Sequence, residues 1–96
     1  MTTTMPLTLP HLLYAMGDPV RLAILHKLAA APAGLSCGDL CPATPRSTLT
    51  HHLKILRESG LITTEKQGQT HINRLHATAL ESRFPGLLAT ILRHAG

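Results

Sequence analysis

The strongest constraint on the fold is a segment with helix signals at both ends, from Thr44 to Gly60. Thr44 is a residue type that caps helices, and Pro45 fits the first helical position, where no backbone donor is needed. Gly60 supplies the left-handed residue that commonly ends a helix. Between these ends leucine recurs at helical spacing, which gives a buried stripe of Leu49, Leu53 and Leu56. The segment therefore predicts a helix with an apolar inner face and a polar outer face.

Similar signals predict shorter helices earlier in the chain. Asp18 can cap a helix whose first position is Pro19. Ser36 and Asp39, three residues apart, form a weaker version of the capping box and begin a short helix. Residues 9–16 are mostly apolar and predict a further helix before these two.

The segment after Gly60 predicts a β-hairpin and then more helix. Two β-prone runs, 61–66 and 70–75, flank a polar turn at 67–69 that contains glycine. Thr78 and Glu81 then have capping-box spacing, so we expect a helix to start near Ala79. Pro85 interrupts that helix, and an apolar segment follows from Pro85 to about Arg93.

This order of elements predicts a winged helix-turn-helix. Two helices joined by a short turn, the second with a polar outer face, describe a helix-turn-helix, and a hairpin directly after it supplies a wing. The fold class is therefore mainly α with a two-stranded β-wing. A chain of 96 residues has room for one domain, so we expect a single domain over 1–96, with 1–8 disordered.

Charge favours a nucleic-acid partner. The chain has a net charge of +4, and the stretch 46–74 alone carries five basic and two acidic residues, a net +3. A basic segment on an ordered domain favours a polyanion. The aromatic residues are Tyr14 and Phe84, which argues against modules that stack single-stranded bases.

Double-stranded DNA fits the predicted helix and wing. The start of a helix offers backbone donors and partial positive charge to a phosphate, and residues one turn further on can reach base edges. Ser47 or Thr48 could instead only cap the helix, and we expect His52 to support the helix from within the protein. The expected DNA contacts are Arg46, Ser47, Thr48, Thr50, His51 and Lys54 on the helix, and Lys66, Gln67, Gln69, Thr70 and His71 on the wing.

Several of these segments together resemble the ArsR/SmtB family of repressors. Residues 13–25, LYAMGDPVRLAIL, are similar to the opening of that family, and 47–62, STLTHHLKILRESGLI, to its recognition helix and first wing strand. Residues 66–69, KQGQ, resemble its wing turn. The resemblance spans about 12–75. It implies a homodimer that binds a palindromic operator and usually represses transcription until an inducer, often a metal or metalloid ion, releases it.

The resemblance also implies dimerisation through the first and last helices, here 9–16 and 79–95. The apolar last segment fits this independently, because a small domain that exposes such a patch usually covers it with a second subunit. The expected interface side chains are Leu12, Leu13, Leu87, Leu88, Ile91 and Leu92.

Cys37 and Cys41 are the candidate inducer site. Cysteines four apart on a helix share one face, and two thiolates with a third ligand hold soft ions such as arsenite, Cd²⁺ or Zn²⁺. The family's arsenic and cadmium/lead sensors carry Cys-Val-Cys on this helix, where Ser36 and Gly38 stand here. Its other common site lies on the last helix, where this chain has Ala77 and Ala79. Three interpretations stay open: ordinary half-buried cysteines, thiol oxidation, or a thiophilic metal or metalloid ion; no cofactor is certain.

Other classes of function find little support in the sequence. It contains no Gly-rich phosphate loop, no paired carboxylates and no complete set of metal ligands, so we expect no enzyme activity. No apolar run approaches the ~20 residues that span a bilayer, the N-terminus does not resemble a signal peptide, and we expect a cytoplasmic protein. The alternatives are a winged helix that contacts proteins, or a regulator of this family without small-molecule sensing.

Overall fold

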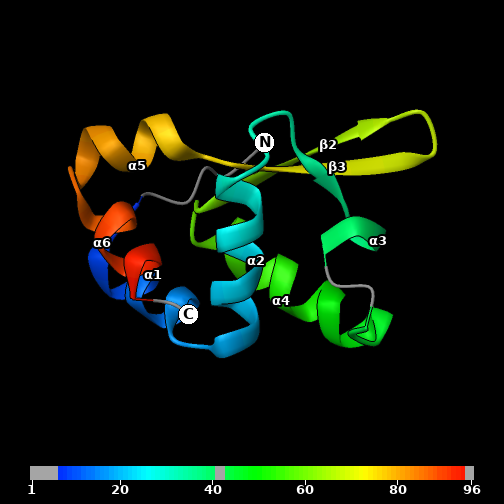
Figure 1. Ribbon diagram of the computed structural model, residues 1–96, viewed down its shortest axis with the longest axis horizontal. Coiled ribbons are helices and arrows are strands. Elements are labelled where there is room, and N and C mark those ends of the chain that lie inside the picture. Colours follow the sequence, from blue (N-terminus) through cyan, green and yellow to red (C-terminus); the bar gives the residue numbers. More distant parts are fainter. Residues whose placement is uncertain (1–6, 41–42, 95–96) are drawn as a thin grey trace.

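Helices surround the base of a small antiparallel sheet in the computed structural model, which describes residues 7–40 and 43–94 (Figure 1). The helices are α1 (Leu9–Met16), α2 (Pro19–Ala29), α3 (Cys37–Leu40), α4 (Arg46–Glu58), α5 (Ala77–Arg83) and α6 (Leu87–Arg93). The strands are β1 (Leu35–Ser36), β2 (Ile62–Gln67) and β3 (Thr70–Leu75). The expected mainly helical fold is confirmed. The expected disorder at 1–8 falls largely outside the described residues.

The turn between α1 and α2 is fixed by Asp18, as predicted. Its Oδ2 accepts hydrogen bonds from the backbone N–H groups of Val20 at 2.9 Å and Arg21 at 3.1 Å. Pro19 occupies the start of α2, where its missing N–H costs nothing. Partial desolvation raises the pKa of Asp18, but these two N–H donors and the neighbouring positive charge outweigh it, so the pKa lies below the ordinary 3.8.

Helix α3 begins with the predicted local hydrogen bonds. The N–H of Asp39 donates to the Ser36 hydroxyl at 3.3 Å, and that hydroxyl donates to the Asp39 carboxylate at 3.0 Å. These bonds satisfy a free donor at the start of the helix, as a capping box does.

Helix α4 begins one residue later than predicted. Pro45, with φ −54° and ψ 142°, is the N-cap, and no side chain caps the helix, so the expected cap at Thr44 is wrong. The proline carbonyl accepts the N–H of Leu49 at 2.9 Å and closes the first turn. At the other end, the Ser59 hydroxyl donates to the Leu56 carbonyl at 2.8 Å, and Gly60 follows with the expected positive φ.

The wing has a tighter turn than predicted and a third strand. Gln67 pairs with Thr70, so Gln67 belongs to β2 and the turn consists of Gly68 and Gln69. Gly68 has φ 63° and no non-glycine residue in the described part of the chain has a positive φ, which matches a type II′ turn. The expectation of a two-stranded wing is corrected because β1 pairs with β3 and gives the sheet order β1-β3-β2.

A buried asparagine on β3 fastens the base of the wing. Asn73 is fully buried; its Oδ1 accepts from the Thr64 hydroxyl at 2.8 Å, and its Nδ2 donates to the Leu35 carbonyl at 3.2 Å. One side chain therefore links all strands of the sheet. Gly34, just before β1, has φ 95°, and a Cβ there would lie 2.5 Å from the Ile72 Cγ2.

The C-terminal helices start and stop at other residues than expected. Helix α5 begins at Ala77 after His76, without a side-chain cap, so the expected cap at Thr78 is wrong. The N–H of His76 donates to the Leu61 carbonyl at 2.9 Å, and this contact fixes the start of α5. The predicted interruption at Pro85 is confirmed, because it lies between α5 and α6.

The core lies between α1, α2, α4 and the base of the sheet. The predicted stripe of α4 is confirmed, since Leu49, Leu53 and Leu56 are all buried. They pack in one cluster with residues of the other elements, including Leu12, Ile24, Leu25, Leu28, Leu40, Leu61 and Leu80. Within 7–40 and 43–94, no helix has the length and apolar character that a membrane crossing needs.

Candidate nucleic-acid interface

The outer face of α4 carries polar side chains that are free to contact a partner. Leu49 and Leu53 point into the core, as predicted, and they hold the helix against α1 and α2. All of the expected contact residues on this helix are exposed: Arg46, Ser47, Thr48, Thr50, His51 and Lys54.

The wing extends a second exposed polar surface beyond the helices (Figure 1). Lys66 pairs with His71 across the hairpin, so their side chains lie on the same face. Glu65 is neutralised by Arg74, whose Nη1 donates to its Oε1 at 2.6 Å. That hydrogen bond, a second from Gln67 and the charge of Arg74 hold the pKa of Glu65 below its ordinary value. The exposed residues expected on the wing are Lys66, Gln67, Gln69, Thr70 and His71.

A groove joins the outer helix face to the wing. A cavity of about 440 Å³ is bounded by α4 on one side and by the sheet on the other. Arg46, Thr50 and Arg57 line it from the helix, and Thr64 and His71 line it from the strands. A smaller hollow of about 240 Å³ at the start of α3 shares Arg46 and His71 with it. The helix and the wing therefore line one groove, which holds two arginines of α4 and a histidine of the wing.

Arg57 is a groove residue that the sequence interpretation missed. It is exposed and lines the same cavity as Arg46. The helical period gives the signal, because Arg46, Thr50, Leu53 and Arg57 follow one another at steps of three or four residues. Arg57 therefore adds a positive charge at the far end of the groove.

His52 is buried, as expected for a residue that supports the helix from within. It is 9% exposed, and its Nδ1 lies 3.1 Å from the Nη1 of Arg21 on α2. His51, the preceding residue, is exposed on the outer face. The two neighbouring histidines therefore differ in burial, although their ring centroids are 5.7 Å apart.

Cys37, at the start of α3, is one of the residues that line the groove. It is half-buried, its Sγ is 3.7 Å from the Nδ2 of Asn73, and it lines both hollows. Cys41 lies outside the described residues, so the expected pairing of the two thiols stays a prediction. Among residues 7–40 and 43–94, no group of three or more His, Cys, Asp or Glu side chains could hold a metal ion.

The expected dimer residues fall into different environments. Leu12 is completely buried in the core of its own subunit and has no surface to offer a partner, which corrects its assignment. Leu13 is 51% exposed, beside the exposed Leu9 and Tyr14. The residues on α6 are half-buried: Leu87, Leu88, Ile91 and Leu92.

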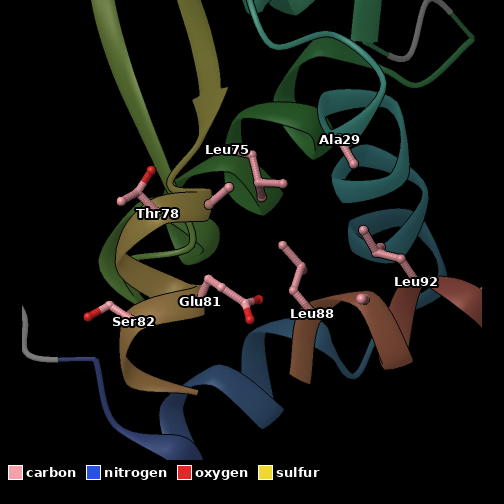
Figure 2. A pocket seen from close by; sticks show the side chains of 9 residues that line it. Ala29, Leu75, Thr78, Glu81, Ser82, Leu88 and Leu92 are labelled. Carbon is pink, nitrogen blue, oxygen red and sulfur yellow. The ribbon is translucent and has the colours of Figure 1, made fainter. Parts of the chain in front are cut away.

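A second cavity, of about 670 Å³, lies between α5, α6 and the end of α2. Figure 2 shows Leu88 and Leu92 of α6 pointing toward Leu75 and Ala29, with Glu81 of α5 beside them. Its walls are mostly aliphatic, unlike the polar groove at the wing.

Comparisons with known proteins agree with this architecture. A family described as "Helix-turn-helix domain" matches residues 16–65. The uncharacterized HTH-type transcriptional regulator YceK of Bacillus subtilis is 35% identical over 80 residues, which cover 80% of this chain and 79% of that protein. The arsenical resistance operon repressor of Staphylococcus xylosus is 35% identical over 77 residues, covering 73% and 67% of the two chains.

Solved structures give the same result. HlyU from Vibrio cholerae has a TM-score of 0.73 and 32% identity, and the match covers 88% of this chain and 87% of HlyU. The sequence relatives are named as transcriptional regulators or repressors, and the winged helix-turn-helix, the exposed outer face of α4 and the basic wing fit that role. The chain is therefore a DNA-binding transcriptional regulator, and it belongs to the ArsR/SmtB family of winged-helix proteins.

Proposed function

We propose that this chain is a homodimeric repressor that binds a palindromic operator in double-stranded DNA, with α4 in the major groove and the wing on the adjacent backbone or minor groove. The single observation that carries the proposal is the groove in which Arg46 of α4 faces His71 of the wing. Because both walls carry basic side chains, a phosphate strand can pass between them. The action is binding, with no catalytic step, in the cytoplasm.

The start of α4 is the part best suited to a phosphate. Its first N–H groups have no partner within the helix, and Arg46 stands beside them. Thr50, His51 and Lys54 lie one turn further on and are placed for base edges or phosphates. The other proposed contacts are Ser47 and Thr48 on the helix and Lys66, Gln67, Gln69, Thr70 and His71 on the wing.

The proposed dimer uses α1 together with α5 and α6, within residues 9–16 and 79–95. Leu9, Leu13 and Tyr14 are exposed at 42%, 51% and 62%, which is unusual for large apolar side chains in so small a domain. Helix α1 runs beside α6 in both figures, so the exposed apolar residues of α1 and the half-buried ones of α6 can contribute to one interface. A two-fold axis through this region would set the half-sites about 10 base pairs apart.

The proposal includes release from DNA by a thiophilic ion or an oxidant that acts at Cys37 and Cys41. Cys37 supports it, because an adduct on its Sγ would fill space between Arg46 and His71. Arsenite, Cd²⁺ and a thiol oxidant should each be titrated into the DNA complex. If none weakens binding more than it does for Cys37→Ser and Cys41→Ser, the chain is a regulator without this sensor.

The experiment for DNA binding starts from a pool of random duplexes. The protein should enrich a palindromic sequence, and its affinity for that duplex should fall steeply with salt. Arg46→Ala should bind about 100-fold more weakly, because the proposed dimer loses two contacts of ~1.4 kcal/mol each. His26→Ala, at an exposed position of α2 outside the proposed DNA-contact and dimer residues, is the control. No enriched duplex, or an affinity that salt does not change, would favour a protein-contact module instead.

A further inference from the structure

Arg21 is a buried arginine on α2 that holds the end of α1. It is 7% exposed. Its Nε donates to the Ala15 carbonyl at 2.6 Å and its Nη2 to the Tyr14 carbonyl at 3.2 Å. These carbonyls end α1, where the helix dipole favours a positive charge. The guanidinium carbon also lies 5.5 Å from the centre of the Tyr14 ring. Two nitrogens of the guanidinium therefore hold the last carbonyls of α1.

The remaining nitrogen reaches the recognition helix. Nη1 of Arg21 lies 3.1 Å from Nδ1 of His52 on α4. A guanidinium can only donate, so this Nδ1 must accept, and the ring proton is on Nε2. Asp18 Oδ2 is 3.9 Å from the same Nδ1, which is too long for a hydrogen bond. His52 is therefore fixed by Arg21, with the carboxylate only nearby.

Apolar packing alone does not explain how α4 keeps its orientation. Leu49, Leu53 and Leu56 bury the inner face of the helix, but hydrophobic contact is non-directional, so it resists rotation and sliding weakly. A hydrogen bond to a charged donor is directional, and leaving that donor unpaired in a buried position is costly. The bond between Arg21 and His52 thus sets the angle of α4 relative to α1.

We propose that Arg21 and His52 are positioning residues for operator binding: they fix the recognition helix against the end of α1, although neither side chain lies on the DNA-facing surface. The inference rests on the proposed role of α4 as the helix that reads DNA. In addition, Arg21 links the position of α4 to that of α1, which carries side chains proposed for subunit contact. Operator affinity should therefore depend on the hydrogen bond itself.

Two amide substitutions at one position test this. In His52→Asn the Oδ1 takes the place of Nδ1 and can accept from Arg21, whereas in His52→Gln the amide lies one bond further out, near the place of Nε2. The full chain should be measured with the enriched operator duplex and with a scrambled duplex, below the melting temperature of each variant. His26→Asn, at an exposed position of α2, is the matched control.

We expect His52→Asn and His26→Asn to bind the operator within about twofold of the wild type. His52→Gln should bind at least tenfold more weakly, because each subunit of the proposed dimer loses a hydrogen bond to a charged group. Affinity for the scrambled duplex should change less. Equal affinities for the Asn and Gln variants would overturn the inference, because a residue that only fills space would not distinguish them.

A further variant covers the case in which His52→Gln does not fold. Arg21→Lys keeps the charge but offers one nitrogen, which cannot serve the α1 carbonyls and His52 together. It should also bind the operator about tenfold more weakly, and wild-type affinity would refute the inference. If Arg46→Ala loses affinity while these variants do not, only the positioning role fails. If Arg46→Ala also binds normally, the proposed role of α4 fails as well.

Discussion

Replacing Lys66 by alanine should reduce the salt dependence of DNA binding by a predictable amount. Lys66 lies on β2 one residue before Gln67, is exposed, and faces His71 across the hairpin. The nearest carboxylate in sequence, Glu65, is already paired with Arg74, so the charge of Lys66 is not offset by it. If the wing lies on the DNA backbone, Lys66 neutralises a phosphate and releases a counterion.

The expected magnitude follows from the exposed cations around the groove. Arg46, Lys54, Arg57 and Lys66 are exposed, which gives four cations in the chain and eight in the proposed dimer. With about 0.9 released counterions per phosphate, the logarithm of affinity should fall with the logarithm of salt at a slope no steeper than about −7. Lys66→Ala removes a pair of contacts, so the slope should become shallower by about 1.8. Between 50 and 200 mM salt the variant should therefore lose roughly tenfold less affinity than the wild type.

Fluorescence anisotropy of a labelled operator duplex at four salt concentrations measures these slopes. Lys66→Arg keeps the charge and should keep the slope. The reasoning is wrong if Lys66→Ala has the wild-type slope, or if Lys66→Arg reduces it equally.

Three further predictions concern stability and assembly. Asp18→Asn keeps a capping oxygen but has no ionisable group. Because folding lowers the pKa of Asp18 below 3.8, the wild type should lose stability relative to this variant as the pH falls through that lowered pKa. Urea unfolding of both proteins at pH 3 to 7 measures the difference. Gly34→Ala should destabilise by about 2–5 kcal/mol through its positive φ and its clash with β3, whereas Gly68→Ala, with open space around it, should cost about 1–2 kcal/mol by the same denaturation assay. Leu12→Ala should cost about 2–5 kcal/mol of stability, whereas Leu13→Glu should leave the subunit folded but shift it to a monomer in sedimentation experiments, and a dimeric Leu13→Glu would contradict the proposed interface.

The parts of the fold that the sequence predicts depend on neighbours in the chain. Asp18 caps α2 through residues two and three positions on, and the stripe of α4 follows from the helical period. The outer face of α4 and the wing follow from the same periodicity, which is why their expected contact residues are all exposed. Local spacing carries this information without any knowledge of the tertiary structure.

The features that the sequence did not predict depend on residues that are far apart in the chain. Strand β1 has two residues and exists because Leu35 pairs with Asn73, far along the chain, so no alternation pattern could reveal it. The start of α5 is fixed by the bond from His76 to the Leu61 carbonyl, which overrides the capping-box spacing at Thr78. The role of Leu12 was misjudged because a helical face is identified only when its neighbours are known. The hydrogen-bond partner of His52 could not be predicted from the sequence for the same reason, since Arg21 is 31 residues away.

The hydrogen bonds of Asn73 fix the base of the wing inside the protein, so a small rotation at the base causes a larger movement of the tip. From Asn73 to the turn at Gly68 the hairpin extends about 15 Å, so a tilt of only about 5° at the base moves the tip by roughly 1 Å. Such a displacement is enough to break a hydrogen bond to DNA. The Cys37 thiol lies 3.7 Å from the Asn73 amide, at the fixed base of the wing. A small change of volume or bonding at this half-buried thiol would therefore move the wing tip further than it moves the base of the wing, without altering any residue proposed to contact DNA.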